Sequence, residues 1–167
     1  MMQTEDMRIR SIHCLALCAL LLQAAIVLCQ QLSIQAGNAK PVVLSRTDIE
    51  ALPRMKVTAN TSAGPVTFEG ASLKAVLEKA AVGFGETLKG RRLASCLLVE
   101  AADGYRVVFA LPELDPAFTE KQVVLAFLKD GKPLDDKEGP YRVVVPDEKR
   151  MARSVRQVTT LKIVDVP

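Results

Sequence analysis

Three arginines near the carboxyl end of the chain have the spacing of a binding site. Arg150, Arg153 and Arg156 lie three residues apart, so a helical turn would place them on one face. A guanidinium is a planar fork of donors that suits phosphate, carboxylate or the amide edge of a heterocycle, and it also stacks on flat rings. Arg153, Arg156 and Ser154 between them are therefore candidate ligand-binding residues. The alternative is a solvated basic turn, balanced by the acidic pair that precedes it.

A second group of polar residues lies at a predicted hairpin turn. Asp103-Gly104 separates two apolar stretches and is a strong turn signal. The Asp103 carboxylate can accept N–H groups of a heterocycle, and the Tyr105 ring can stack on it. The alternative, which turn chemistry favours, is that both residues only shape the hairpin.

Several kinds of catalytic site are excluded by where the cysteines and the one histidine fall. His13, Cys14, Cys18 and Cys29 all lie in the first 29 residues, which leaves Cys96 further along. If that segment is removed, the chain has no histidine-based zinc site, no Ser-His-Asp triad and no internal disulfide. Cys96 lies in an apolar stretch and is expected to be a small buried residue.

The N-terminal segment has the order of a secretory signal peptide. Basic Arg8 and Arg10 precede residues 11–29, which are uncharged and almost wholly apolar, and small residues follow. We assign residues 1–39 to the signal, with cleavage after Ala39 and cleavage after Ala36 as second choice. The alternative is an uncleaved anchor. Either way the rest of the chain is expected to be exported, to the periplasm or outside the cell.

The composition fits one ordinary domain and argues against nucleic acid as a partner. The 167 residues are 49% hydrophobic and 25% charged, with a net charge of +3. That excess is too small to indicate a phosphate-binding surface, and aromatic residues are only 4%, without Trp.

The remaining chain, residues 40–167, predicts an α+β domain with mixed sheets and few short helices. Residues 83–92 are expected to be a mobile loop, and Thr47 to cap a short helix over Asp48–Leu52. Ser72–Ala81 has a helical apolar stripe, with Ser72 as its cap and Gly83 at its end. The expected strands are 42–44, 55–59, 66–69, 96–101, 106–110, 123–128, 141–145 and 160–164.

Five phrases in the second half resemble, in order, the molybdopterin-binding domain of the sulfite oxidase family. They are Gly70-Ala-Ser-Leu73, Glu100-Ala-Ala-Asp-Gly-Tyr105, Leu125-Ala-Phe127 with Asp130-Gly-Lys-Pro-Leu134, Glu138-Gly-Pro-Tyr-Arg-Val-Val-Val-Pro146, and Ala152-Arg-Ser-Val-Arg156. The resemblance covers roughly residues 54–165. It implies the sulfite-oxidase-type fold, with Arg153 and Arg156 at positions that lie over a pterin. Gln157 and Met151 depart from the family's usual Trp and Gly.

The resemblance also indicates what this chain lacks. Enzymes of the family bind molybdenum through a cysteine on a strand before the Gly70 turn, where this chain reads Met55–Ser62 without Cys. Asn60 or a neighbour occupies the place, as a polar ligand contact or a plain turn residue. Without a thiolate, molybdenum loses its main protein bond, so the molybdenum cofactor is not favoured.

The resemblance to a short exported subgroup therefore predicts a pterin-binding protein without a covalently bound cofactor. Its expected pocket lies between the Asn60 region and the Arg153–Arg156 turn, and its expected partner is an inner-membrane receptor. The resemblance leaves enzymatic activity open and favours its absence. Two alternatives remain: an oxidoreductase or oxidoreductase subunit that holds the molybdenum cofactor, and a scaffold without ligand.

Overall fold

The structure is a computed structural model that describes residues 31–165. The chain divides into two units, Met1–Gln31 and Leu32–Pro167, of which the second is the subject here. The apolar segment over residues 11–29 lies outside the described residues. Within them, no helix is both long enough and apolar enough to cross a membrane.

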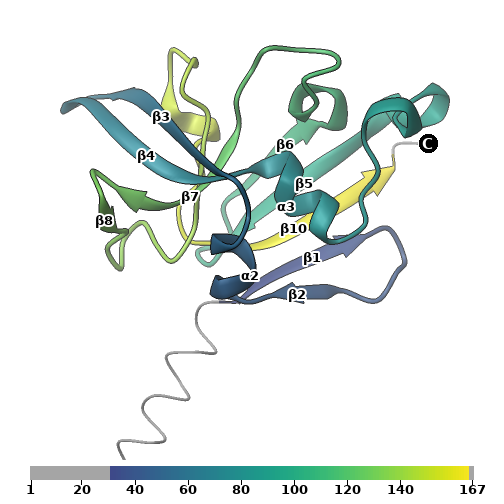
Figure 1. Ribbon diagram of the computed structural model, residues 1–167, viewed down its shortest axis with the longest axis horizontal. Coiled ribbons are helices and arrows are strands. Elements are labelled where there is room, and N and C mark those ends of the chain that lie inside the picture. The colour runs from purple at the N-terminus through teal and green to yellow at the C-terminus, as the bar shows by residue number, and fades with distance from the viewer. Residues whose placement is uncertain (1–30, 166–167) are drawn as a thin grey trace, which may run out of the picture. The chain divides into compact units, whose positions relative to one another are not determined.

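The described chain folds into two sheets with short helices (Figure 1). One sheet has the strand order β2-β1-β10-β5-β6; the other has the order β3-β4-β7-β8, with β9 also paired to β7. The strands are β1 (Leu32–Ala36), β2 (Val42–Leu44), β3 (Arg54–Thr61), β4 (Gly64–Ser72), β5 (Ser95–Ala101), β6 (Arg106–Ala110), β7 (Val124–Lys129), β8 (Lys132–Pro133), β9 (Arg142–Val144) and β10 (Val158–Asp165). The helices are α2 (Arg46–Glu50) and α3 (Leu73–Lys79), with 3-10 turns η1 (Gly85–Thr87), η2 (Gly90–Ala94), η3 (Leu111–Leu114) and η4 (Met151–Arg153).

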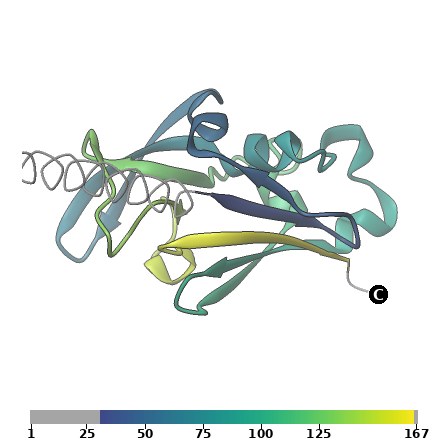
Figure 2. The ribbon, with the colours of Figure 1, turned by 90° about the horizontal axis from the view of Figure 1, so that it is seen from below.

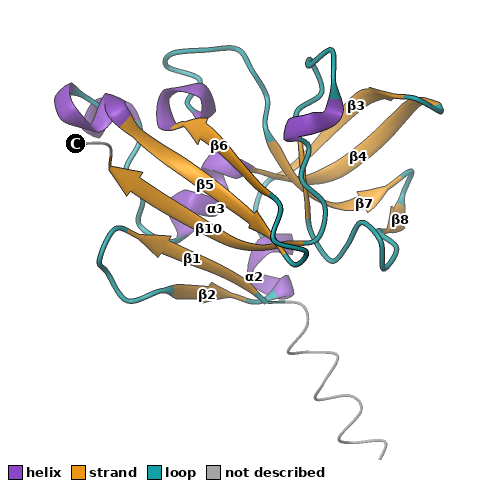
Figure 3. Ribbon diagram, turned by 180° about the vertical axis from the view of Figure 1, so that it is seen from behind, coloured by secondary structure: helices purple, strands orange, loops and turns teal. Residues whose placement is uncertain are grey.

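The main core joins buried residues of the first sheet and of both helices with buried residues of β7 and β9 in the second sheet. Both α2 and α3 lie on one face of the first sheet, as the opposed views in Figures 1 and 3 show. Leu73, Val76 and Leu77 of α3 are fully buried there beside strand residues such as Leu97 and Leu161. The predicted α+β class with mixed sheets is confirmed, since β1 and β10 are parallel and the other pairs antiparallel.

Strand β1 was not predicted, because its residues fall in the segment assigned to the export signal. β1 lies between β2 and β10 in the sheet, and Figure 2 shows β1 and β10 side by side. Leu32 and Ile34 are 0% and 1% exposed. The folded unit thus begins at Leu32, eight residues before the predicted start at Lys40. Cleavage itself stays a prediction.

The two helices differ from expectation only at their ends. Ser45, not Thr47, caps α2: its hydroxyl accepts from the Asp48 N–H at 3.2 Å, and the Asp48 carboxylate accepts from the Ser45 N–H at 2.9 Å. This reciprocal pair satisfies two free donors at once, which a Thr47 cap would not. Ser72 caps α3 as predicted, and the helix ends at Lys79.

Residues 83–92, expected to be a mobile loop, are folded back onto the domain. Phe84 and Leu88 are 8% and 1% exposed, and they anchor the turns η1 and η2. The buried Asp115 carboxylate accepts from the Gly85 N–H at 2.6 Å. Burial opposes ionisation of Asp115, but backbone hydrogen bonds and the nearby Lys74 ammonium lower its pKa below the ordinary value.

A close approach between β4 and β7 explains the glycine at position 70. The register of the two strands shifts between Glu69 and Gly70. A Cβ on Gly70 would lie 2.0 Å from the Leu125 carbonyl oxygen, so no other residue fits without moving the strand.

Candidate functional site

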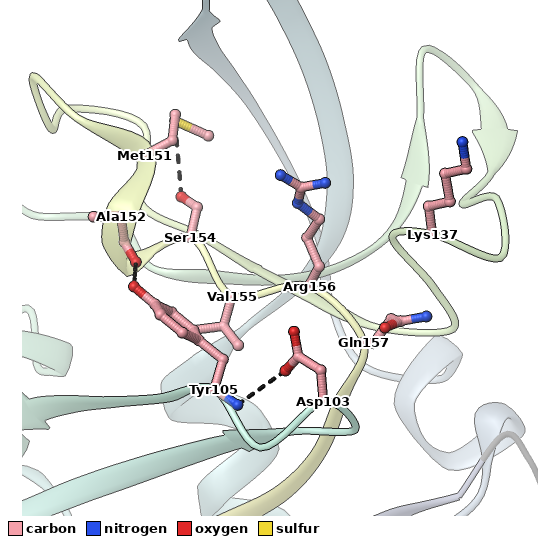
Figure 4. Close-up of a pocket in the computed structure, with 9 residues that line it drawn as sticks. All are labelled: Asp103, Tyr105, Lys137, Met151, Ala152, Ser154, Val155, Arg156 and Gln157. Atoms are coloured by element: carbon pink, nitrogen blue, oxygen red, sulfur yellow. Dashed lines mark hydrogen bonds between the residues drawn. The ribbon is translucent and has the colours of Figure 1, made fainter.

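A hollow of about 430 Å³ opens where three segments distant in sequence meet (Figure 4). These segments are the turn of the β5–β6 hairpin, the loop between β8 and β9, and the segment from η4 to the start of β10. We call the hollow the Arg156 pocket. Its lining residues are Asp103, Tyr105, Lys137, Met151, Ala152, Ser154, Val155, Arg156 and Gln157.

The hairpin side of the Arg156 pocket is held by hydrogen bonds at both of its polar residues. The Asp103 carboxylate accepts from the Tyr105 N–H at 2.9 Å, which closes the turn together with the left-handed Gly104. The Tyr105 hydroxyl donates to the Ala152 carbonyl at 2.8 Å and so ties the hairpin to η4. Asp103 and Tyr105 therefore shape the turn, as the structural alternative expected, and also line the pocket.

Gln157 joins all three segments at the base of the pocket. Its N–H donates to the Glu138 carbonyl at 2.9 Å, and its carbonyl accepts from the Ala102 N–H at 2.9 Å. Its side-chain amide donates to the Asp136 carbonyl at 2.6 Å. Gln157 takes a φ of 49°, a conformation uncommon outside glycine and asparagine. These three bonds hold the residue there, so the pocket is built around a fixed backbone corner.

Two cationic side chains of the pocket are not neutralised by the protein. Arg156 and Lys137 are both exposed, and no acidic side chain within residues 31–165 forms an ion pair with either. Figure 4 shows both side chains extending toward the same side of the pocket, above Gln157. They are available to an anionic or carbonyl-bearing ligand, with the Asp103 carboxylate on the hairpin side as acceptor.

Arg153, predicted as the partner of Arg156, is occupied elsewhere and does not line the pocket. Its Nε donates to the Glu148 carboxylate at 2.7 Å, and its Nη2 donates to the Glu113 carboxylate at 3.2 Å. Its guanidinium lies 4.7 Å from the centre of the Phe109 ring. The Glu148 and Glu113 carboxylates raise the pKa of Arg153 above its ordinary value. In this structure Arg153 is a clamp that holds η4 against η3.

The common helical face predicted for Arg153 and Arg156 does not form. Only Met151–Arg153 is helical, as a single 3-10 turn, so Arg156 lies beyond the turn and not on a shared face. Ser154, also predicted, lies at the pocket but is 7% exposed, and its hydroxyl accepts from the Val145 N–H at 3.1 Å. It fixes η4 to the end of β9.

Asn60 is not among the residues that line the Arg156 pocket. It lies near the end of β3, exposed and opposite Pro65. The adjacent Thr61 hydroxyl donates to the Gly64 carbonyl at 2.8 Å, so this end of β3 is turn structure. Lys137, in contrast, was missed, because it lies in a short run of mixed charge that gives no sequence signal.

The comparisons with known proteins identify the family. A family profile described as "Oxidoreductase molybdopterin binding domain" matches residues 45–167. The chain belongs to this family, and the resemblance to the sulfite oxidase type of molybdopterin-binding domain is confirmed.

A solved structure shows the same fold. The chain is similar to the sulfane dehydrogenase SoxCD from Paracoccus pantotrophus, with a TM-score of 0.63 and 22% sequence identity over 83% of this chain. The match spans 39% of the SoxCD chain, so the present chain corresponds to less than half of that protein. No curated protein matches the sequence.

The Arg156 pocket is a candidate site for a small organic ligand. Its lining is mainly polar, with groups of both signs, and Met151 and the Tyr105 ring add apolar surface. Its volume is that of a small-molecule site. Within residues 31–165, no group of three or more His, Cys, Asp or Glu is placed to hold a metal ion. Half-buried Cys96 is at the opposite end of β5, about 16 Å from Ala101 by the rise of a strand.

Proposed function

We propose that this chain binds a pterin in the Arg156 pocket. Membership of a molybdopterin-binding family supports a pterin as the class of ligand. The observation that carries the proposal is the pair of unneutralised cations, Arg156 and Lys137, at the edge of a preformed hollow. Polar groups that converge on one hollow are typical of ligand sites.

The lining residues suit the different parts of a pterin. The Asp103 carboxylate is an acceptor for the ring's amino and N–H groups. Arg156 and Lys137 are donors for its carbonyl oxygen or for the phosphate of molybdopterin, where a charged hydrogen bond is strong. Met151 contacts the flat face of the ring, and the Tyr105 hydroxyl stays on Ala152.

The family description supports a role in an oxidoreductase system, as the enzyme or as a subunit. When bound, the complete molybdenum cofactor supplies two-electron redox chemistry. This chain's residues would bind and orient the pterin, but Met55–Ser62 offers no thiolate to the metal. In the oxidoreductase reading, another ligand or a partner protein completes the metal site.

The absent thiolate favours a second candidate, an exported pterin-binding sensor. In this reading the chain acts in the periplasm and transmits ligand binding to an inner-membrane receptor. Its support is the missing cysteine together with the signal-like N-terminal sequence. Detergent extracts of inner membranes test it: a receptor that co-purifies with the chain only when reduced pterin is present supports the sensor.

Purification from cells that make the molybdenum cofactor separates the two roles. Bound molybdenum together with a pterin phosphate supports the oxidoreductase role. A bound pterin without metal supports the sensor. If neither is present, and Arg156→Ala leaves the biological function intact, the domain is a scaffold and both proposals fail.

A further inference from the structure

Strand β1 bears directly on where the export segment ends. Its residues pair with two neighbours: Ser33 lies opposite Thr160 of β10 and opposite Val43 of β2. Leu32 and Ile34 fill the main core at 0% and 1% exposure. A segment with these contacts is part of the folded domain.

Cleavage after Ala36 or Ala39 would remove this strand. β2 pairs in its sheet only with β1 among the described strands, so it would lose its place, and β10 would have an open edge. Two fully buried side chains would also leave the main core and open a cavity in it. Cleavage after Ala39 would also remove the hydrogen bond from the Gly37 N–H to the Ile163 carbonyl, at 3.3 Å.

The sequence contains a cleavage motif upstream of β1. Gln23 interrupts the apolar run, so the apolar core before it, Cys14–Leu22, has the length of a normal signal core. Val27-Leu28-Cys29 then places a short branched residue at position −3 and a small residue at −1. Gln30 and Gln31 follow in the sequence, before the first residue of β1, Leu32.

We propose that the export signal is cleaved between Cys29 and Gln30, so that the mature chain keeps all of β1. The step is hydrolysis of one amide bond: water adds, the Cys29 carbonyl becomes a carboxylate, and Gln30 becomes the new amino terminus. Processing also removes Cys14, Cys18 and Cys29, which leaves Cys96 as the sole thiol. The inference rests on the export part of the proposed function.

Expression of the full chain in a Gram-negative host tests this inference. The intact mass of the periplasmic protein should correspond to residues 30–167. Cys29→Leu, which places a large residue at −1, should convert most of the product to unprocessed precursor. Ala39→Leu is the matched control, because Ala39 is exposed, and it should be processed like the wild type.

Three results would overturn the inference: a mature terminus at Gly37 or Lys40, normal processing of Cys29→Leu, or an unprocessed wild-type chain. Full-length protein retained in the cytoplasm would remove export itself. Pterin binding by the purified protein is measured separately, so a failure of processing and a failure of the binding proposal remain distinguishable.

Discussion

Arg153 and Arg156 should differ in role: Arg153 stabilises the fold, whereas Arg156 binds ligand. Arg153→Ala removes ion pairs to Glu148 and Glu113 and a stacking contact with Phe109. The Arg153 side chain is 29% exposed, so solvent weakens each ion pair. The free energy of unfolding should therefore fall by about 2 kcal/mol in total. Arg156 forms no hydrogen bond or ion pair through its side chain within residues 31–165. Arg156→Ala should therefore change the free energy of unfolding by less than about 0.5 kcal/mol.

Thermal unfolding followed by circular dichroism, with a urea titration as the second measure, tests this difference. Arg153→Ala should lower Tm by roughly 6 °C, whereas Arg156→Ala should leave it unchanged. Arg153→Lys keeps the charge but loses the planar fork, so it should recover less than half of the loss. Pterin affinity should fall at least tenfold in Arg156→Ala. Equal Tm values for the two alanine variants would refute the assignment of Arg153 as the clamp.

Three other predictions concern the fold and the pocket wall. Gly70→Ala places a methyl group against the Leu125 carbonyl, so it should lower the free energy of unfolding, measured with urea, by about 3 kcal/mol. A decrease of less than about 1 kcal/mol would contradict the close approach of β4 and β7. Because the pKa of Asp115 is lowered in the folded state, its stabilisation is present above the ordinary pKa of 3.8 and is lost as pH falls through the lowered value. Between pH 6 and pH 2, the urea midpoint of Asp115→Asn should therefore fall less steeply than that of the wild type. Parallel curves for the two proteins would show that ionised Asp115 does not stabilise the fold. Tyr105→Phe removes only the hydrogen bond from the Tyr105 hydroxyl to the Ala152 carbonyl. Calorimetry should show a free energy of unfolding lower by about 1 kcal/mol and a pterin affinity that is a few-fold weaker. Unchanged values would show that this bond does not stabilise the pocket.

The sequence predicted those elements whose signals are local. Asp103-Gly104 marked the β5–β6 hairpin, and the apolar stripe with Ser72 as cap marked α3. β1 could not be predicted, because it follows closely on the signal-like segment and no change in composition marks where the strand begins. Its assignment needs the pairing with β10, more than a hundred residues away.

The candidate site was predicted in part, for a related reason. Asp103 and Tyr105 of the hairpin turn meet Arg156 in one pocket, although Arg156 lies about fifty residues further along the chain. The spacing of the arginines suggested a common face, but the short length of η4 and the carboxylates of Glu113 and Glu148 decide where Arg153 lies. Contacts over such sequence separations are set by tertiary structure, and a spacing rule cannot supply them.

Calorimetric titration of the purified chain with a reduced pterin tests the central claim most directly. The account predicts saturable binding of one pterin with a Kd below about 100 μM, or roughly −5.5 kcal/mol, and its loss in Arg156→Ala at unchanged Tm. Absence of saturable binding by the folded wild-type chain, or equal affinity in the wild type and Arg156→Ala, would contradict it.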